Sequence, residues 1–213
     1  QQNKRISGEA FNPSEAIFAT DKTVVVIGGG DTGSDCIGTS LRQGAKGVTQ
    51  LEILPKPPAE RPQQNPWPTW PVILRESHAH KEGGERKWSV TTKAFFGEND
   101  AVKQLQCAEV EWIKKEPDGP LVPREKEGTE FELSADLVIL AMGFMGPGNE
   151  ALIQNFGIEL DERGNVKADQ RQMTSMEGIF TAGDMTTGQS LIVRAIASGR
   201  KAASGIVSYL RKI

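Results

Sequence analysis

The most specific chemical pattern in the sequence is a glycine-rich turn of the form G-x-G-x-x-G. In such a turn the first glycine permits a tight bend, the second lets the backbone approach a pyrophosphate, and the third allows close packing of a helix on a strand. The N–H groups at the start of the helix then face the diphosphate. A glycine turn without a ligand is the alternative. The residues of the turn are Gly28, Gly29, Gly30, Asp31, Thr32 and Gly33.

The elements around this turn make the motif much stronger evidence than the glycines alone. Residues 23–27 are a threonine followed by four β-branched apolar residues, which is typical of a strand buried on both faces of a parallel sheet. A helical stretch to about residue 43 comes next, and residues 48–54 predict a second strand. We therefore predict a strand-turn-helix-strand unit that binds NAD(H) or NADP(H).

Three residues near the end of the second predicted strand bear on the choice of coenzyme. Glu52 lies close to the position where an acidic residue would bond the ribose hydroxyls of NAD. Lys56 and Arg61 follow, and either could accept the 2′-phosphate of NADP. Both coenzymes stay open, as does a plain surface role for each of the three residues.

A second pattern resembles the C-terminal FAD fingerprint of flavoproteins with two dinucleotide-binding folds. An apolar stretch, residues 178–182, ends in Gly183 and Asp184. The resemblance implies that Asp184 accepts a hydrogen bond from the ribityl chain of the flavin. The N-terminus of the final helix would stabilise the negative charge that develops at flavin N1 and O2 on reduction. An unliganded strand end is the alternative. The segment that opens this helix is Gly188, Gln189, Ser190 and Leu191.

Between the two patterns, an apolar strand at residues 136–141 runs into Ala141, Met142 and Gly143. This segment resembles the turn by which such chains leave the nucleotide domain and re-enter the flavin domain, with Met142 in place of the usual threonine. The resemblance makes these three residues candidates for cofactor contacts.

The remaining segments indicate an α/β fold class. Seven prolines within residues 55–71 exclude a helix or a central strand there. An antiparallel β-meander is predicted for residues 89–98, 105–115 and 130–133, and later elements for 149–156 (helix), 161–164 (turn), 178–182 (strand) and 190–210 (helix). We predict a connector (1–20), a Rossmann-like nucleotide-binding domain with a parallel sheet plus the meander (21–143), and the C-terminal part of an FAD-binding domain (144–213).

Almost the whole chain resembles the small (β) subunits of glutamate synthases. Thr186, Thr187 and Arg194 stand where many members carry basic residues and an aromatic residue. The stretches that carry the resemblance are residues 28–36, 51–55, the Pro/Trp loop, 141–144, 160–165 and 182–200.

The resemblance implies hydride transfer from NAD(P)H to FAD. Electrons would then pass through iron–sulfur clusters to the large (α) subunit, which makes glutamate from glutamine and 2-oxoglutarate. The N-terminal FAD glycine motif and the cluster-binding cysteines of the family are expected in an upstream segment, because the chain opens on Gln1 rather than Met. The isolated chain is expected to be inactive. The transfer needs little acid–base chemistry, so His78 and His80 are predicted to lie in a mobile polar loop without a catalytic role.

Two other functions compete with this prediction. The electron-input module of a pyrimidine dehydrogenase shares the layout, and a module that only binds nucleotide would show the same glycine turn. A thioredoxin reductase is less favoured, because no C-x-x-C motif is present.

The composition indicates which kinds of partner and which cellular compartment to expect. The formal charge of −3 arises from interspersed residues without a basic stripe, and no run of eighteen apolar residues occurs, so neither nucleic acid nor a membrane is an expected partner. A cytoplasmic protein is predicted. Cys36 and Cys107 lack metal-site spacing and are expected to be buried thiols.

The loop of residues 55–88 is too long and too aromatic for a passive connection. Trp67 and Trp70 could present a docking surface for a neighbouring domain or subunit. The alternative is that both tryptophans cap the core of the nucleotide domain itself.

Overall fold

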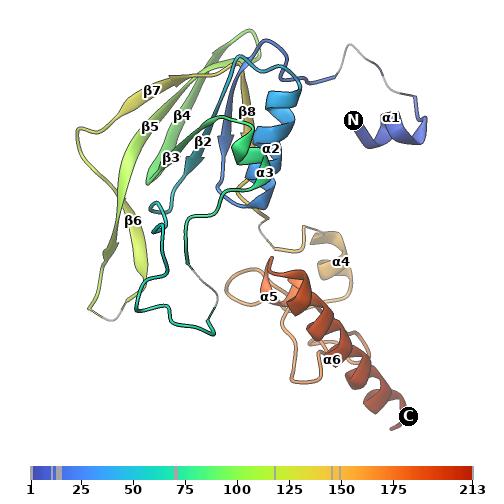
Figure 1. Ribbon diagram of the computed structural model, residues 1–213. Coiled ribbons are helices and arrows are strands. Elements are labelled where there is room, and N and C mark those ends of the chain that lie inside the picture. Colours follow the sequence, from blue (N-terminus) through green and yellow to red (C-terminus); the bar gives the residue numbers. More distant parts are fainter. Residues whose placement is uncertain are drawn as a thin grey trace. The chain divides into compact units, whose positions relative to one another are not determined.

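A computed structural model describes residues 2–10, 12, 16–69, 72–117, 119–144, 146–148 and 150–212 (Figure 1). The chain divides into two compact units, residues 1–142 (unit 1) and residues 143–213 (unit 2). Unit 1 holds two hydrophobic clusters and unit 2 holds a third.

Unit 1 is built on a four-stranded parallel sheet in the order β3-β2-β1-β8 (Figure 1). Strand β1 is buried because both of its faces are covered. Val24 and Val26 pack with Ile37 of helix α2, whereas Val25 packs with Leu105 of a second sheet. The predicted burial on both faces is therefore confirmed. The elements are β1 (Thr23–Ile27), α2 (Asp31–Arg42), β2 (Gly47–Glu52), β3 (Glu85–Trp88) and β8 (Leu137–Leu140).

The second sheet of unit 1 is antiparallel and centres on its longest strand, β5. This strand pairs with β4 and β7 along its first half and with β6 along its end. The predicted antiparallel sheet is confirmed, but strand β6 was not predicted, because Pro123 within it argues against a strand. The strands are β4 (Val90–Glu98), β5 (Ala101–Lys114), β6 (Leu121–Glu125) and β7 (Phe131–Ser134).

Two elements of unit 1 lie in the segment predicted to be a loop. Strand β3 is the edge of the parallel sheet, and its sequence Glu85-Arg86-Lys87-Trp88 lacks the apolar run of a central strand. Helix α3 (His78–Lys81) is too short to show a helical period, yet Ser77 caps it by accepting from the His80 N–H at 3.3 Å. The predicted loop location of the two histidines is wrong, because both lie on α3.

The described residues of unit 2 form three helices joined by ordered turns. The turn at residues 161–164 is confirmed by the Gly164 N–H, which donates to the Asp161 carbonyl at 3.0 Å. The strand predicted at residues 178–182 is wrong: Phe180 forms only one isolated bridge, to Met173, so no ladder builds up there. A strand needs a continuous partner, and the described part of unit 2 supplies none. The helices are α4 (Glu150–Asn155), α5 (Asp184–Thr187) and α6 (Ile192–Leu210).

Several other predictions differ from the structure in detail. The helix predicted at 149–156 corresponds to α4, with Asn149 outside the described residues. Helix α1 (Gln2–Ser7) forms where no element was predicted, since six residues show no apolar period. Trp67 is 83% exposed and does not cap the core of unit 1, while Trp70 lies outside the described residues. Among the described residues, no helix combines the length and apolar character that a membrane span requires.

Candidate functional site

The glycine turn joins β1 to α2, as the motif predicts, and its three motif glycines have different surroundings. Gly28 has φ +125°, and a Cβ there would collide with the Ala141 carbonyl. A Cβ on Gly33 would collide with the Gly28 carbonyl, so α2 can pack closely on the turn. Gly30 has no heavy atom within 4 Å of a built Cβ, so the space beside it is open. Two glycines thus serve close packing, and the third faces room for a ligand.

The start of α2 can receive an anion. Gly30 is its N-cap, and no side chain within the described parts of the chain caps it. The N–H groups of the first helical turn therefore keep donor capacity, and the helix dipole places its positive end there. Asp31 and Thr32 are exposed in this first turn. This geometry suits a diphosphate.

A cavity of about 540 Å³ opens beside the glycine turn. Glu52 lies at its wall next to Gly29, where a Cβ would collide with the Glu52 carboxylate. One Glu52 oxygen accepts from the Leu54 N–H at 3.0 Å. The polar residues that line the cavity are Asp31, Ser34, Glu52, Lys56, Arg75, Ser77, His80 and Arg86.

The two basic residues predicted near this site differ in position. Lys56 lines the cavity. Arg61 does not appear in its wall, and its Nη1 instead donates to the carbonyls of Asn65 at 3.0 Å and Thr69 at 2.9 Å. Arg61 thus holds the Pro-rich loop together, which leaves Lys56 as the better placed of the two.

Arg86 is a cavity residue that the sequence analysis missed, because its strand was predicted to be loop. Its guanidinium lies 4.5 Å from the centre of the Trp88 ring and donates to the Arg75 carbonyl at 3.3 Å. Its Nε is buried and meets no hydrogen-bond acceptor among the described residues. Desolvation lowers the pKa of Arg86 below its usual value, although Glu76 and Glu52 act in the opposite direction. Arg86 therefore contributes a guanidinium charge to the cavity wall.

Unit 2 contains the second group of predicted site residues around a cavity of about 570 Å³. Asp184 begins α5, and the Gly183 N–H before it donates to Ser198 Oγ at 3.0 Å. Gln189 accepts from the Phe144 N–H at 2.7 Å, and a Cβ on Gly143 would collide with the Gln189 amide. The cavity is lined by Phe144, Gly146, Pro147, Gly148, Arg163, Asn165, Asp184, Met185, Thr187, Gly188 and Gln189.

The remaining predicted residues divide between the two units. Ala141 and Met142 lie in unit 1 against Gly28, whereas Gly143 belongs with Gln189 in unit 2. Leu191 is the N-cap of α6 and Ser190 precedes it, and neither lines the cavity of unit 2. Arg163 and Asn165 were not predicted as site residues, although the turn at 161–164 signalled an ordered loop there.

The two cysteines are poor nucleophiles. Cys107 is buried as predicted, whereas Cys36 is only half-buried. Burial raises the pKa of both thiols, and Asp35 raises that of Cys36 further. Neither cysteine lines either of the two cavities.

The model of the pyridine nucleotide-disulphide oxidoreductase family matches residues 2–199. The chain belongs to this family. Family membership supports an oxidoreductase that binds NAD(P)H and flavin.

Curated relatives confirm the resemblance to glutamate synthases. The chain is 52% identical over 194 residues to the glutamate synthase [NADPH] small chain of Mycobacterium tuberculosis, covering 91% of this chain and 38% of the relative. It is 43% identical over 214 residues to the glutamate synthase [NADH] of Schizosaccharomyces pombe, covering 97% of this chain and 10% of the relative. The chain therefore spans well under half the length of both relatives.

Solved structures share the fold. Thioredoxin reductase from T. acidophilum aligns with a TM-score of 0.61 and 25% identity, covering 89% of this chain and 53% of that chain. Mycobacterium tuberculosis FprA in complex with NADPH aligns with a TM-score of 0.64 and 14% identity, covering 91% of this chain and 54% of that chain. The α/β fold class with its parallel and antiparallel sheets is thus confirmed.

Proposed function

We propose that this chain is the NADPH-binding part, with a portion of the flavin site, of a glutamate synthase small subunit. The observation that carries the proposal is the uncapped glycine turn that opens on the cavity of unit 1. It supplies backbone donors for a diphosphate and room for a dinucleotide beside them. The identity to glutamate synthase small chains supports the assignment to this subunit rather than to a pyrimidine dehydrogenase module.

Preference for NADPH over NADH rests on the charges of the unit 1 cavity. Lys56, Arg75 and Arg86 line it together with Glu52. Arg86 brings a positive charge to the cavity wall, and a 2′-phosphate bound there would pair with its guanidinium. The small chain from Mycobacterium tuberculosis is named for NADPH, which agrees with this basic wall, whereas the relative from Schizosaccharomyces pombe is named for NADH.

Unit 2 would provide part of the FAD site. Asp184 presents a carboxylate at the wall of the second cavity, as the ribityl contact requires. Bound FAD would take a hydride from the nicotinamide and pass the electrons onward. Asn165 and Arg163 add polar groups that can orient a flavin at the same cavity. This assignment makes residues 144–213 the C-terminal part of the FAD-binding domain.

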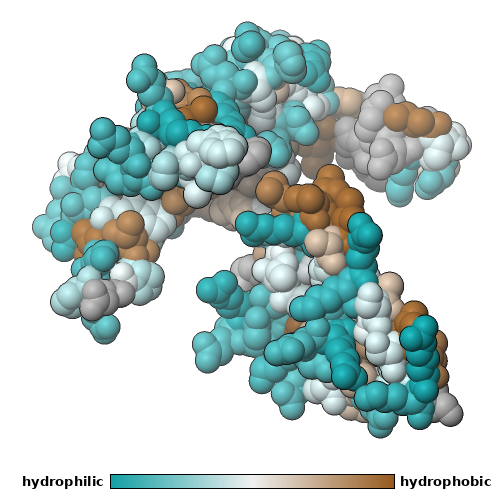
Figure 2. All heavy atoms as spheres, turned by 60° about the horizontal axis from the view of Figure 1, so that its bottom comes forward, coloured by the Kyte–Doolittle hydropathy of each residue, from teal (hydrophilic) through white to brown (hydrophobic). Residues whose placement is uncertain are grey.

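The rest of the flavin site would come from sequence outside this chain. Apolar side chains gather on the surface of unit 2 (Figure 2). The start of α6 exposes Leu191, Ile192, Val193 and Ile196, of which Ile192 is 80% exposed. An upstream segment with the first FAD glycine motif and the iron–sulfur cysteines would cover such a surface, and the large subunit would receive the electrons. The low coverage of the relatives supports a longer native protein.

Gly30→Val tests the nucleotide site without disturbing the fold. Gly30 has φ −78°, which any L-residue can adopt, and open space around its Cβ, so valine fills only the volume that a diphosphate needs. We expect the full-length Gly30→Val variant to keep the melting temperature and flavin content of the wild type. It should lose reduction of the flavin by NADPH under anaerobic conditions.

Gly47→Val is the matched control, because Gly47 also has open space beside a built Cβ and begins strand β2, where valine is favoured. It should behave as wild type. Equal flavin reduction by wild type and Gly30→Val would refute the proposed nucleotide site.

A further inference from the structure

A chain of part-buried hydrogen bonds begins beneath the glycine turn at Gln50 of strand β2. The Gln50 side chain is 1% exposed, and its Nε2 donates to the Gly28 carbonyl at 2.8 Å. Its Oε1 lies 3.1 Å from His80 Nε2 on helix α3. A built Cβ on Gly33 would lie 2.8 Å from Gln50 Nε2, so the amide fills the space between Gly28 and Gly33. Gln50 thus supports the turn from below.

The hydrogen bonds of His80 admit one arrangement of protons. The Ser77 backbone N–H can only donate, and it donates to His80 Nδ1 at 3.3 Å. The ring therefore carries its proton on Nε2 and donates it to Gln50 Oε1. The Gln50 amide must then turn its NH₂ group toward Gly28, whose carbonyl can only accept. Every donor in this series meets an acceptor.

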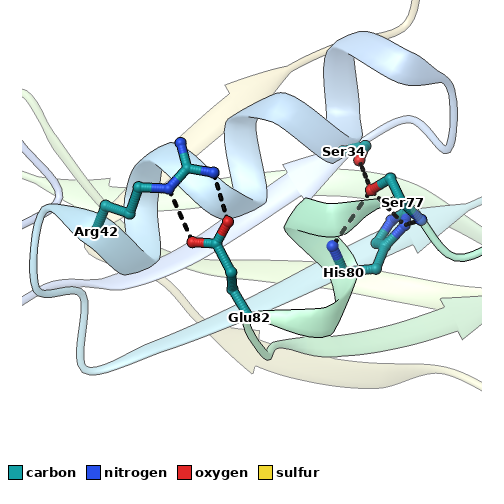
Figure 3. Close-up of polar contacts among 5 residues, drawn as sticks. All are labelled: Ser34, Arg42, Ser77, His80 and Glu82. Atoms are coloured by element: carbon teal, nitrogen blue, oxygen red, sulfur yellow. Dashed lines mark hydrogen bonds and ion pairs between the residues drawn. The ribbon is translucent and has the colours of Figure 1, made fainter.

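The chain of hydrogen bonds returns to the glycine turn through two serines. Figure 3 shows the Ser77 hydroxyl bonded both to the Ser34 hydroxyl, in the first turn of α2, and to His80. The Ser34 N–H donates to the Gly30 carbonyl at 3.0 Å. The series Gly28, Gln50, His80, Ser77, Ser34 and Gly30 thus starts and ends on the same turn.

Helices α2 and α3 are also joined by a second contact, which does not reach the glycine turn. Arg42 near the end of α2 donates through Nε to Glu82 Oε2 at 2.8 Å, and a second bond links Arg42 Nη2 to Glu82 (Figure 3). Neither side chain of this ion pair is buried. It holds α3 to α2 at the surface, whereas the series through Gln50 and His80 holds the peptide groups of the turn.

We propose that His80 and Gln50 are positioning residues for the glycine turn, which set its affinity for the diphosphate of a pyridine dinucleotide by fixing the Gly28 and Gly30 carbonyls. An anion site made of backbone N–H groups binds best when those groups are held in place before the ligand arrives. The inference rests on the proposed function, since it assumes that this turn binds NADPH.

The test uses the full-length protein with its flavin, mixed with NADPH in anaerobic stopped-flow experiments. His80→Ala and Gln50→Leu each remove one partner from this part-buried series, so the apparent Kd for NADPH should rise about tenfold. The limiting rate of flavin reduction at saturating NADPH should stay unchanged. His80→Gln should recover most of the affinity, because glutamine at this position of the helix can also accept from the Ser77 N–H.

Glu82→Gln is the matched control, because it breaks the exposed ion pair with Arg42 that joins α2 and α3. The Kd of this variant for NADPH should stay within about twofold of wild type. A Kd within about twofold of wild type in both His80→Ala and Gln50→Leu, with only a lower melting temperature, would overturn the positioning role. A fall in the limiting rate at unchanged Kd would overturn it too. A wild-type protein that does not bind NADPH would instead overturn the proposed function itself.

Discussion

Arg86 offers the sharpest test of coenzyme choice, through the substitution Arg86→Gln. The Arg86 guanidinium sits over Trp88, and its Nε has no acceptor within the described structure. A 2′-phosphate that accepts from the part of the guanidinium facing the cavity would gain one charge-assisted hydrogen bond, worth about 1.5–3 kcal/mol. Loss of that bond should raise the Kd for NADPH by roughly 10- to 150-fold. NADH has no 2′-phosphate, so its Kd should change much less.

The assay is calorimetric titration of the full-length protein with each coenzyme, together with thermal unfolding of the variant. Arg86 also contributes its contact with Trp88, worth about 0.5–1 kcal/mol, so a small fall in melting temperature is expected. Arg61→Gln is the control, because Arg61 binds carbonyls of its own loop and should leave both affinities unchanged. If Arg86→Gln weakens the binding of NADH as much as that of NADPH, or weakens the binding of neither coenzyme, Arg86 does not recognise the 2′-phosphate.

Three other predictions concern Glu52, His80 and Trp67. Glu52→Ala removes a carboxylate from the same cavity wall and should improve NADPH relative to NADH; an unchanged ratio of affinities would place Glu52 away from the ribose. Burial, followed by Arg86, lowers the pKa of His80 in the folded protein, with Glu76 opposing. A histidine with a depressed folded pKa stabilises the fold above its unfolded pKa of about 6.5 and loses that contribution as pH falls through the folded value. The difference in unfolding free energy between wild type and His80→Gln should therefore shrink from about pH 8 to about pH 5, and a constant difference in urea titrations would contradict the assignment. Trp67→Ala should leave the melting temperature nearly unchanged, because Trp67 is 83% exposed, while it weakens association with the large subunit; unaltered association in a pull-down would remove Trp67 from any interface.

The sequence by itself determined the parallel core and the glycine turn. Residues 23–27 are typical of a strand buried on both faces of a covered parallel sheet, and a glycine motif directly after such a strand indicates a turn into a helix. These are local requirements, so Gly28, Gly30 and Gly33 could be assigned distinct roles before any contact was known. The family resemblance likewise followed from contiguous stretches of sequence.

Only the tertiary structure decided which distant residues meet at the cavity of unit 1. Arg86 lies on an edge strand whose charged sequence does not indicate a strand. Gln50 is 1% exposed, but its sequence context is that of any polar strand residue. Only the fold brings it into contact with His80, which lies 30 positions away in the sequence. Arg61 was a candidate for phosphate binding until its hydrogen bonds to Asn65 and Thr69 placed it in the loop. Strand pairing across the sheet and helix packing set these neighbours, because the pattern within one element does not say which distant element will lie beside it.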